Sequence, residues 1–96
     1  MLRERIRERK DVLLIGVDVA KRKHVASLCG PFRKMLVPTY GFFNSRSGFE
    51  DFRNMVKEVQ DSYGFNYVVV GLESTGLYKK SLEGFLWASG YHVVSV

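Results

Sequence analysis

Two acidic residues stand at the ends of stretches that otherwise have the composition of buried strands. Asp18 lies between valines in "VLLIGVDVA", and Glu73 ends the apolar run "NYVVVGLE". A carboxylate that is buried without a partner costs several kcal/mol or takes up a proton. Two such residues in a chain of 96 residues therefore suggest one shared purpose.

A shared divalent cation is one chemistry that explains such a pair. Two ionised carboxylates about 4 Å apart repel each other by roughly 4 kcal/mol at an effective dielectric of 20, and a cation or a shared proton removes that repulsion. Oxygen ligands without a cysteine cluster favour Mg²⁺ or Mn²⁺ over zinc. Two such ions about 4 Å apart stabilise both the attacking and the leaving oxygen of a phosphoryl displacement. The simpler alternative is that Asp18 pairs with a lysine and that Glu73 supplies a favourable charge at a helix N-terminus.

Strand and helix signals define the framework that must position these carboxylates. Apolar and β-branched runs separated by short turns indicate strands at 12–19, 24–29, 34–43, 66–73 and 91–96. Apolar residues at helical spacing indicate helices at about 47–62 and 76–89. Pro38 predicts that the third strand lies at an edge of the sheet. The nearly continuous apolar run before Glu73 predicts a central strand that is covered on both faces.

The helix boundaries follow from capping signals. Ser47 and Glu50 have the spacing of a capping box, and Gly64 and Gly90 are placed to end the two helices. The side chains expected to face the core are Phe49, Phe52, Val56, Val59 and Tyr63 in the first helix and Tyr78, Leu82, Phe85 and Leu86 in the second.

The resulting order, β-β-β-α-β-α-β, is that of an α/β ribonuclease H-like fold. Short turns join the first three strands into an antiparallel meander, and right-handed crossovers then add two parallel strands beside the first. The predicted architecture is a mixed five-stranded sheet with strand order 3-2-1-4-5 and flanking helices. Because the first and fourth strands are neighbours, about 4.8 Å apart, Asp18 and Glu73 are expected to lie close together at one end of the sheet.

Length and composition fit one small globular domain. Apolar residues make up 46% of the chain, and no apolar run approaches the roughly 20 residues that span a bilayer. The first residues carry charge but no apolar segment of a signal peptide, and a lone cysteine, Cys29, excludes an internal disulfide. We therefore expect a cytoplasmic protein without membrane contact.

Positive charge is concentrated in the first third of the chain. Residues 1–34 hold ten Lys/Arg against four Asp/Glu, whereas residues 35–96 hold five against six. Residues 1–11 form a basic lead-in, expected to be a frayed helix or a solvated segment. A polyanionic partner is therefore expected at the N-terminal half of the chain.

Three stretches resemble a known family. They are "GVDVAKRKHVASL" (16–28), "GFFNSRSGFEDF" (41–52) and "VVVGLESTGLYKKSLEGFLWASGYHVVSV" (68–96). Together they are similar to the DEDD-type transposases of bacterial insertion sequences, which carry a RuvC-like N-terminal domain akin to Holliday-junction resolvases and include bridge-RNA-guided recombinases. The combination of "ESTG" before an aromatic residue with "GVDVAK" on the first strand is specific, whereas either piece alone is weak.

The resemblance implies a function and a site. Asp18 matches the first acidic residue of the family's tetrad and Glu73 the second, so both are expected to be catalytic metal ligands for Mg²⁺ or Mn²⁺. The family's other two aspartates lie beyond its fifth strand, and its C-terminal domain supplies a serine implicated in strand exchange. Residues 12–96 are therefore expected to be an incomplete RuvC-like catalytic subdomain, inactive alone. The implied partners are DNA, a guide (bridge) RNA and further copies of the full-length protein.

Other polar residues near the two carboxylates are candidate nucleic-acid contacts. Lys21, Arg22 and Lys23 follow Asp18 and are expected to meet phosphates, with a solvated hairpin tip as the alternative. Ser74 and Thr75 follow Glu73 at a helix start, where free N–H groups bind phosphate. Ordinary helix capping is the alternative for these two residues.

Two other functions remain open from the sequence. A non-catalytic nucleic-acid-binding module shares the basic character of this chain. Sugar kinases and actin-like ATPases share the fold and place an aspartate on the first strand, followed by a glycine-rich phosphate turn. Ala20 and Lys21 stand where that turn requires glycine, so the close backbone approach to phosphate is missing.

Overall fold

The computed structural model describes residues 11–73 and 77–95, so the lead-in lies outside the described residues except for Asp11. The elements are β1 (Val12–Asp18), β2 (Lys23–Cys29), the short 3₁₀ turn η1 (Pro31–Arg33), β3 (Met35–Phe43), α2 (Arg46–Tyr63), β4 (Tyr67–Glu73), α3 (Lys79–Ala88) and β5 (His92–Ser95). The predicted order of strands and helices is confirmed.

One five-stranded sheet has the order β3-β2-β1-β4-β5, which confirms the predicted mixed sheet of the ribonuclease H-like class. β1, β2 and β3 pair antiparallel, whereas β4 pairs parallel with both β1 and β5. Pro38 lies in β3, at the edge of the sheet as predicted. Asp11 continues the β1–β4 pairing, because its carbonyl oxygen accepts bonds from the N–H groups of Asn66 and Tyr67 at 2.8 and 3.1 Å.

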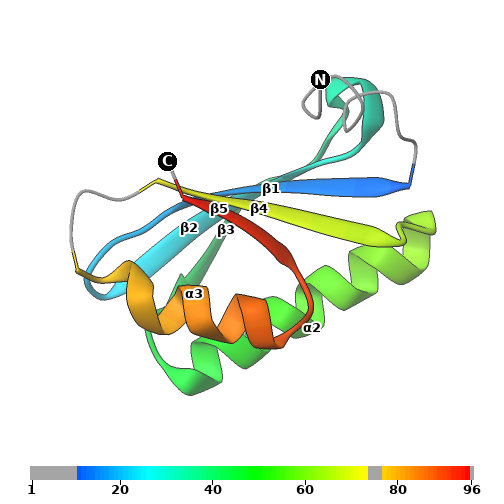
Figure 1. Cartoon of the computed structure of the whole chain (residues 1–96). Helices are drawn as coiled ribbons and strands as arrows, with labels where there is room; N and C mark the ends of the chain where they lie inside the picture. The colour runs from blue at the N-terminus through cyan, green and yellow to red at the C-terminus, as the bar shows by residue number, and fades with distance from the viewer. Residues whose placement is uncertain (1–10, 74–76, 96) are drawn as a thin grey trace.

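Both helices cover the same face of the sheet (Figure 1). The crossovers β3–α2–β4 and β4–α3–β5 advance in the same direction across the sheet, and two right-handed crossovers that advance the same way place their helices on one face. The prediction that the fourth strand is covered on both faces is therefore wrong. In β4, Val68, Val70 and Leu72 are buried, whereas Tyr67 and Glu73 are exposed on the opposite face.

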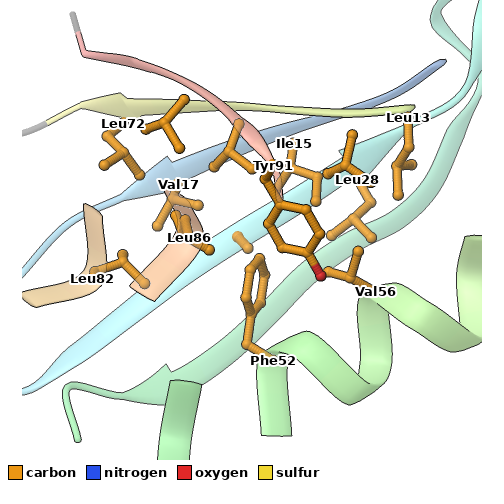
Figure 2. Close-up of a cluster of buried hydrophobic side chains, with 14 of the residues drawn as sticks. Leu13, Ile15, Val17, Leu28, Phe52, Val56, Leu72, Leu82, Leu86 and Tyr91 are labelled. Carbon is orange, nitrogen blue, oxygen red and sulfur yellow. The ribbon is translucent and has the colours of Figure 1, made fainter. Parts of the chain in front are cut away.

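The core lies between this sheet and the two helices (Figure 2). Alternate residues of β1, namely Leu13, Ile15 and Val17, point toward the helices and are buried. Phe52 from α2 and Leu82 from α3 meet them and are fully buried. Because both helices pack on this face (Figure 1), they leave open the end of the opposite face that carries Asp18 and Glu73.

The start of α2 differs from the prediction. Ser45, not Ser47, is the N-cap, and its hydroxyl accepts a bond from the N–H of Gly48 at 3.1 Å. Glu50 does not reach back to a cap; it accepts a bond from Nε of Arg46 at 2.9 Å. A Cβ atom at Gly48 would collide with the backbone of Phe43, so the close approach of the first turn of α2 to the end of β3 fixes where the helix begins.

The apolar stripe of α2 is confirmed in part. Phe49, Phe52 and Val56 are buried and Val59 packs against the core, but Tyr63 is 54% exposed, so its predicted inward orientation is wrong. Tyr63 is the last residue of the helix, and its ring stacks on that of Phe65, with 5.7 Å between the centroids. The helix ends as predicted at Gly64, which has φ 74°.

The second helix begins later than the sequence predicted. α3 starts at Lys79 rather than near residue 76, and Tyr78 takes the N-cap position. Tyr78 is therefore off the helical stripe and is 45% exposed, so its predicted core position is wrong. Leu82 and Leu86 are buried and Phe85 is partly buried, and Gly90 follows the C-cap with φ 85°, as predicted. No helix in the described part of the chain has the length and apolar content needed to cross a membrane.

His24 is the one buried polar side chain in the described core. Its Nδ1 accepts a bond from the N–H of Ala20 at 3.1 Å, so the neutral ring must carry its proton on Nε2, which has no partner in the described residues. The ring packs against Phe42 and Phe49, with centroids 5.2 and 6.1 Å away. Burial lowers the pKa of His24, and the nearby side chain of Asn44 opposes this effect more weakly.

One leucine before α3 and one within it provide a test of which side chains form the core. Leu82 is 0% exposed and Leu77 is 85% exposed. Replacing Leu82 by Ala is expected to lower the free energy of unfolding by about 2–5 kcal/mol, whereas the same change at Leu77 is expected to alter it by less than about 0.5 kcal/mol. Urea unfolding of both variants measures the difference, and equal losses would contradict the assignment of the buried face.

His24 makes the stability of the chain depend on pH. Its pKa is lower in the folded chain than the unfolded value of 6.5, so the unfolded chain takes up the proton first as the pH falls. The stabilisation is expected to be complete above the unfolded pKa and to be lost as the pH falls below it toward the folded pKa. Urea unfolding between pH 8 and pH 5 should show this loss in the wild type, and His24→Leu should remove that component. Parallel pH profiles of the two proteins would contradict the role given to His24.

Candidate functional site

Asp18 and Glu73 are cross-strand partners in the parallel pair β1–β4. Each is the last residue of its strand, and the pairing continues one step further, because the N–H of Val19 donates to the carbonyl oxygen of Glu73 at 3.0 Å. Residues that pair in register on neighbouring parallel strands project to the same face of the sheet. The two carboxylates are therefore neighbours at one end of the sheet, as the sequence predicted.

Both carboxylates are exposed rather than buried. They project from the face of the sheet opposite the helices, because their neighbours Val17 and Leu72 fill the core side. Water screens two charges on such a face, and two unit charges 4 Å apart in water repel by only about 1 kcal/mol. The cost of burial therefore does not explain why the two carboxylates occur together.

An open hollow of about 430 Å³ surrounds the carboxylates. Its lining includes Gly16, Ser27 and Gly71 beside Asp18 and Glu73. Gly16 and Gly71 are themselves cross-strand partners and precede the two carboxylates by two residues, so they share the same face. The nearest atoms to a Cβ added at Gly16 or Gly71 would be 3.7 and 3.9 Å away, so packing within the described residues does not require glycine at either position.

The glycine pair is a site feature that the sequence interpretation missed. The signal was present, because the same pattern of glycine, one apolar residue and a carboxylate occurs in "GVD" and in "GLE". Glycine inside a strand weakens it and often marks a place where a ligand or another backbone approaches closely. Two glycines side by side next to two carboxylates leave bare backbone exposed on this face of the sheet.

Hydrogen bonds with Asn44 and His24 fix the basic loop that follows Asp18. The side chain and the backbone N–H of Asn44 donate to the carbonyl oxygens of Lys21 and Arg22 at 3.0 and 2.8 Å, and His24 accepts from Ala20. Lys21 and Arg22 are exposed in this loop. Sequence reasoning did not identify Asn44, which follows β3 and has no local signal of this role.

The three predicted basic residues differ in their surroundings. The side chain of Lys23 passes close to Gly41, and its Nζ lies 5.7 Å from the ring centroid of Phe43. Both partners belong to β3, on the side of β2 away from β1. Lys21 and Arg22 remain the basic candidates nearest Asp18 in the chain, while Ser74 and Thr75 lie outside the described residues.

The described residues supply two acidic ligands rather than a complete metal site. Over residues 11–73 and 77–95, no group of three or more histidine, cysteine, aspartate or glutamate side chains is placed to hold a metal ion. Neither Asp18 nor Glu73 forms an ion pair within those ranges, so the alternative that Asp18 pairs with a lysine finds no support there. The site can contribute two hard oxygen ligands and an open approach.

Solved structures offer distant similarities. The Aquifex aeolicus PPX-GPPA enzyme aligns with 88% of this chain at 13% identity and a TM-score of 0.46, and 36% of that enzyme's chain is covered. The type II variant of the Aquifex aeolicus Ppx/GppA phosphatase gives 12% identity over 88% of this chain, with a TM-score of 0.46 and 35% of the phosphatase covered. The present chain thus spans about a third of the length of these proteins. No curated protein matches it significantly.

The sequence also matches a family model. Residues 15–96 match the model of the DEDD transposases of IS110 type, which is described as a transposase. The match begins within β1, continues through β5 and includes both carboxylates and both strand glycines. It agrees with the resemblance on "GVDVAK" and "ESTG" and with the ribonuclease H-like strand order. This chain belongs to the IS110-type DEDD transposase family and corresponds to the N-terminal domain of such an enzyme.

Proposed function

We propose that this chain is the N-terminal catalytic domain of a DNA transposase or recombinase in which Asp18 and Glu73 hold Mg²⁺ or Mn²⁺ for phosphoryl transfer on DNA. The observation that carries the proposal is the in-register pairing of the two carboxylates on the open face of the sheet. Carboxylate oxygens are the ligands that these cations prefer. Further ligands would have to come from residues outside the described part of the chain.

The bound cation would polarise a phosphoryl oxygen and stabilise charge on the attacking and leaving oxygens. The chain's own residues hold and orient it. The β1–β4 hydrogen bonds on either side of them fix the backbone of Asp18 and Glu73, so the Cα atoms of the two ligands keep one separation. Such a rigid pair of strand ends places a metal more reproducibly than ligands on loops.

The surroundings of the carboxylates fit a DNA strand as the substrate. Gly16 and Gly71 leave space on the sheet next to the carboxylates, so a sugar–phosphate backbone can approach the site closely. Lys21 and Arg22, on a loop that Asn44 anchors, would contact the phosphates that flank the reacting one. A guide RNA, assembly with further copies and a cytoplasmic location belong to the same proposal through the family resemblance.

A non-catalytic nucleic-acid-binding module is the second candidate for the 96-residue chain by itself. It is favoured by the incomplete ligand set, because the described residues bring together only two acidic side chains. The two candidates differ in one measurable property. Metal-dependent cleavage or strand transfer requires Asp18 and Glu73, whereas binding to phosphates does not.

The carboxylates are tested in a transposase that contains this domain together with the family's remaining acidic residues. Asp18→Asn or Glu73→Gln is expected to reduce strand cleavage and recombination by at least about 100-fold, since even groups that only orient metal ligands contribute about 10–100-fold. Asp61→Asn and Glu58→Gln, which change exposed carboxylates of α2, are the matched controls and should keep wild-type activity. Recombination by the Asp18→Asn enzyme at the wild-type rate would overturn the proposal.

The two amide variants are expected to lose activity but to keep the stability of the folded chain. Asp18 and Glu73 are exposed and have no ion-pair partner in the described residues, so the amide variants are expected to shift the free energy of unfolding by less than about 0.5 kcal/mol. Urea unfolding of the 96-residue chain measures this. A loss of more than about 2 kcal/mol would show that the carboxylates stabilise the fold, which the proposal does not allow.

A further inference from the structure

The helix-covered side of the molecule carries a second polar feature, a groove between α2 and α3. Its volume is about 620 Å³, and it runs between the first turns of α2 and the exposed side of α3. The groove lies on the side opposite Asp18 and Glu73, because both helices cover the other face of the sheet (Figure 1). The residues that line it are Asn44, Ser45, Arg46, Phe49, Arg53, Lys80, Ser81, Gly84, Phe85, Ala88 and Ser89.

Every charged residue that lines this groove is positive. Arg46 and Arg53 come from α2 and Lys80 from α3, and the lining includes no aspartate or glutamate. These are three of only five Lys/Arg residues after residue 34, in the part of the chain where acidic residues are more numerous. The fold therefore brings together basic residues that are far apart in the sequence, and no single segment of the sequence is rich in them.

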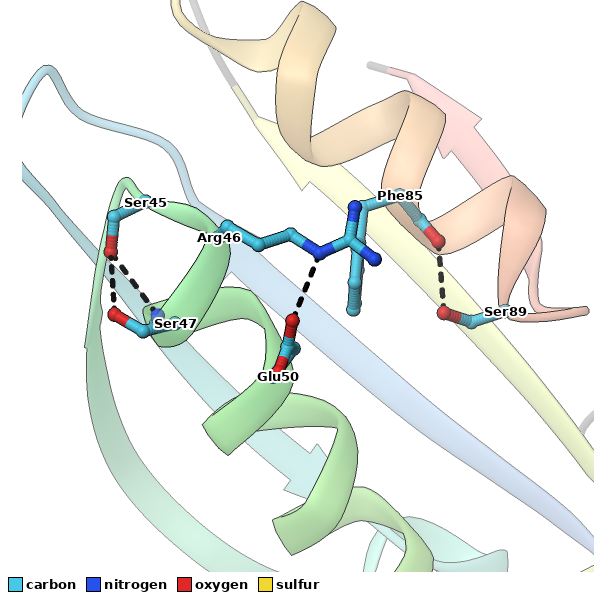
Figure 3. A network of polar contacts seen from close by, with 7 residues as sticks. Ser45, Arg46, Ser47, Glu50, Phe85 and Ser89 are labelled. Carbon is cyan, nitrogen blue, oxygen red and sulfur yellow. Dashed lines mark hydrogen bonds and ion pairs between the residues drawn. The ribbon is translucent and has the colours of Figure 1, made fainter.

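The ring of Phe85 organises both guanidinium groups. The Cζ atoms of Arg46 and Arg53 lie 5.5 and 5.0 Å from its centroid, within the range of cation–π attraction. Nε of Arg46 also donates to Glu50 at 2.9 Å (Figure 3), and its two outer nitrogens have no hydrogen-bond partner among the described residues. Phe85 itself is fixed against Phe49, at 5.5 Å between ring centroids.

Two of the three basic side chains can bind an anionic ligand without first breaking an ion pair within the described residues. Neither Arg53 nor Lys80 has an ion-pair partner among the residues that the structure describes. Arg46 shares its charge with Glu50 on one side only, in an exposed pair that contributes little in water. Hydroxyl groups of Ser45 and Ser81 lie along the same groove and add neutral hydrogen-bonding groups between the cations.

We propose that this groove binds the phosphodiester backbone of a nucleic-acid strand, as a contact surface separate from the carboxylate site. Guanidinium groups held in place by an aromatic ring offer paired N–H donors to phosphate oxygens, and the entropy of fixing them is already lost before binding. The cations come from two helices that line one groove of about 620 Å³, so a strand lying along it can place more than one phosphate beside them. The chain belongs to a transposase family, and transposases act on DNA. A nucleic-acid backbone is therefore the polyanion that we expect to bind in this groove.

Fluorescence anisotropy with the 96-residue chain tests the groove directly. Labelled duplex DNA and labelled RNA of the same sequence are the probes, and EDTA in the buffer excludes any contribution of a divalent cation at Asp18 and Glu73. The variant with Arg46, Arg53 and Lys80 all changed to Gln is expected to bind the preferred probe at least 10-fold more weakly than the wild type. Its affinity should also depend less on salt, and the slope of log K against log salt should be smaller by about 1 for each phosphate that the variant no longer binds.

A variant that removes the same charge elsewhere is the matched control. Arg33, Lys34 and Lys57 are exposed and do not line the groove, and changing them to Gln lowers the net charge equally. This control should lose less than threefold in affinity, and Arg53→Lys should recover only part of the loss of Arg53→Gln because it restores charge without the stacked plane. Equal losses in the groove variant and the control would overturn the proposal, as would an unchanged affinity of the groove variant for both probes.

The assay also separates this surface from the proposed catalytic site. The groove variant and its control are compared without a divalent cation, so the difference between them does not depend on metal binding by Asp18 and Glu73, which lie on the opposite face. The groove is supported if binding depends on Arg46, Arg53 and Lys80 even when the Asp18→Asn enzyme proves active and the catalytic proposal fails. Which probe binds more tightly distinguishes DNA from RNA as the strand that occupies the groove.

Discussion

The parallel pairing of β1 with β4, in a single register, is the constraint on which the rest of the molecule depends. It runs without a break from Val12 opposite Tyr67 to Asp18 opposite Glu73, and it brings together two segments that are 55 positions apart in the chain. Side chains alternate along a strand, so a slip of one residue would move Glu73 to the core face and Leu72 into solvent. The burial of Val68, Val70 and Leu72 therefore fixes the position of the carboxylate as firmly as it fixes the core.

The same topology gives the molecule two different faces. Crossovers that advance in one direction place α2 and α3 together, which concentrates the core on one side and leaves Gly16, Asp18, Gly71 and Glu73 on the other. On the helix side, Arg46 and Arg53 of α2 lie against Phe85 of α3, and Lys80 lines the same groove. Because a sheet separates the two surfaces, each can contact a nucleic acid without competing with the other. We propose the carboxylate face for chemistry at a phosphate and the groove for contact with a strand.

Most of the fold could be predicted because it depends on local patterns. The β-branched runs gave the strands, Gly64 and Gly90 gave the helix ends, and the order of elements with right-handed crossovers gave the sheet order. The errors occurred where tertiary packing overrides a local signal. Ser47 had capping-box spacing, but the approach of Gly48 to Phe43 makes Ser45 the cap. Tyr78 had helical spacing, but α3 begins only after it.

The carboxylate pair could be predicted from topology, but its environment could not. Apolar neighbours suggested that Asp18 and Glu73 were buried, and only the common side of the two helices shows that they are exposed. Asn44, which holds the loop of Lys21 and Arg22, and the groove around Phe85 are made by residues without any local motif. Charge counting also pointed to the first third of the chain and away from Arg46, Arg53 and Lys80. Contacts between distant segments create these features, so no window of sequence contains them.

The assignment of Asp18 and Glu73 as metal ligands can be tested by locating Mn²⁺, from its anomalous scattering, in crystals of a transposase that contains this domain. We expect a peak at the ends of β1 and β4, within direct bonding distance of both carboxylates, about 2.1 Å for a bond of the Mg²⁺ type. The peak should disappear in crystals of the Asp18→Asn protein grown under the same conditions. A fully occupied Mn²⁺ site elsewhere in an active enzyme, with no density between these two carboxylates, would contradict the assignment.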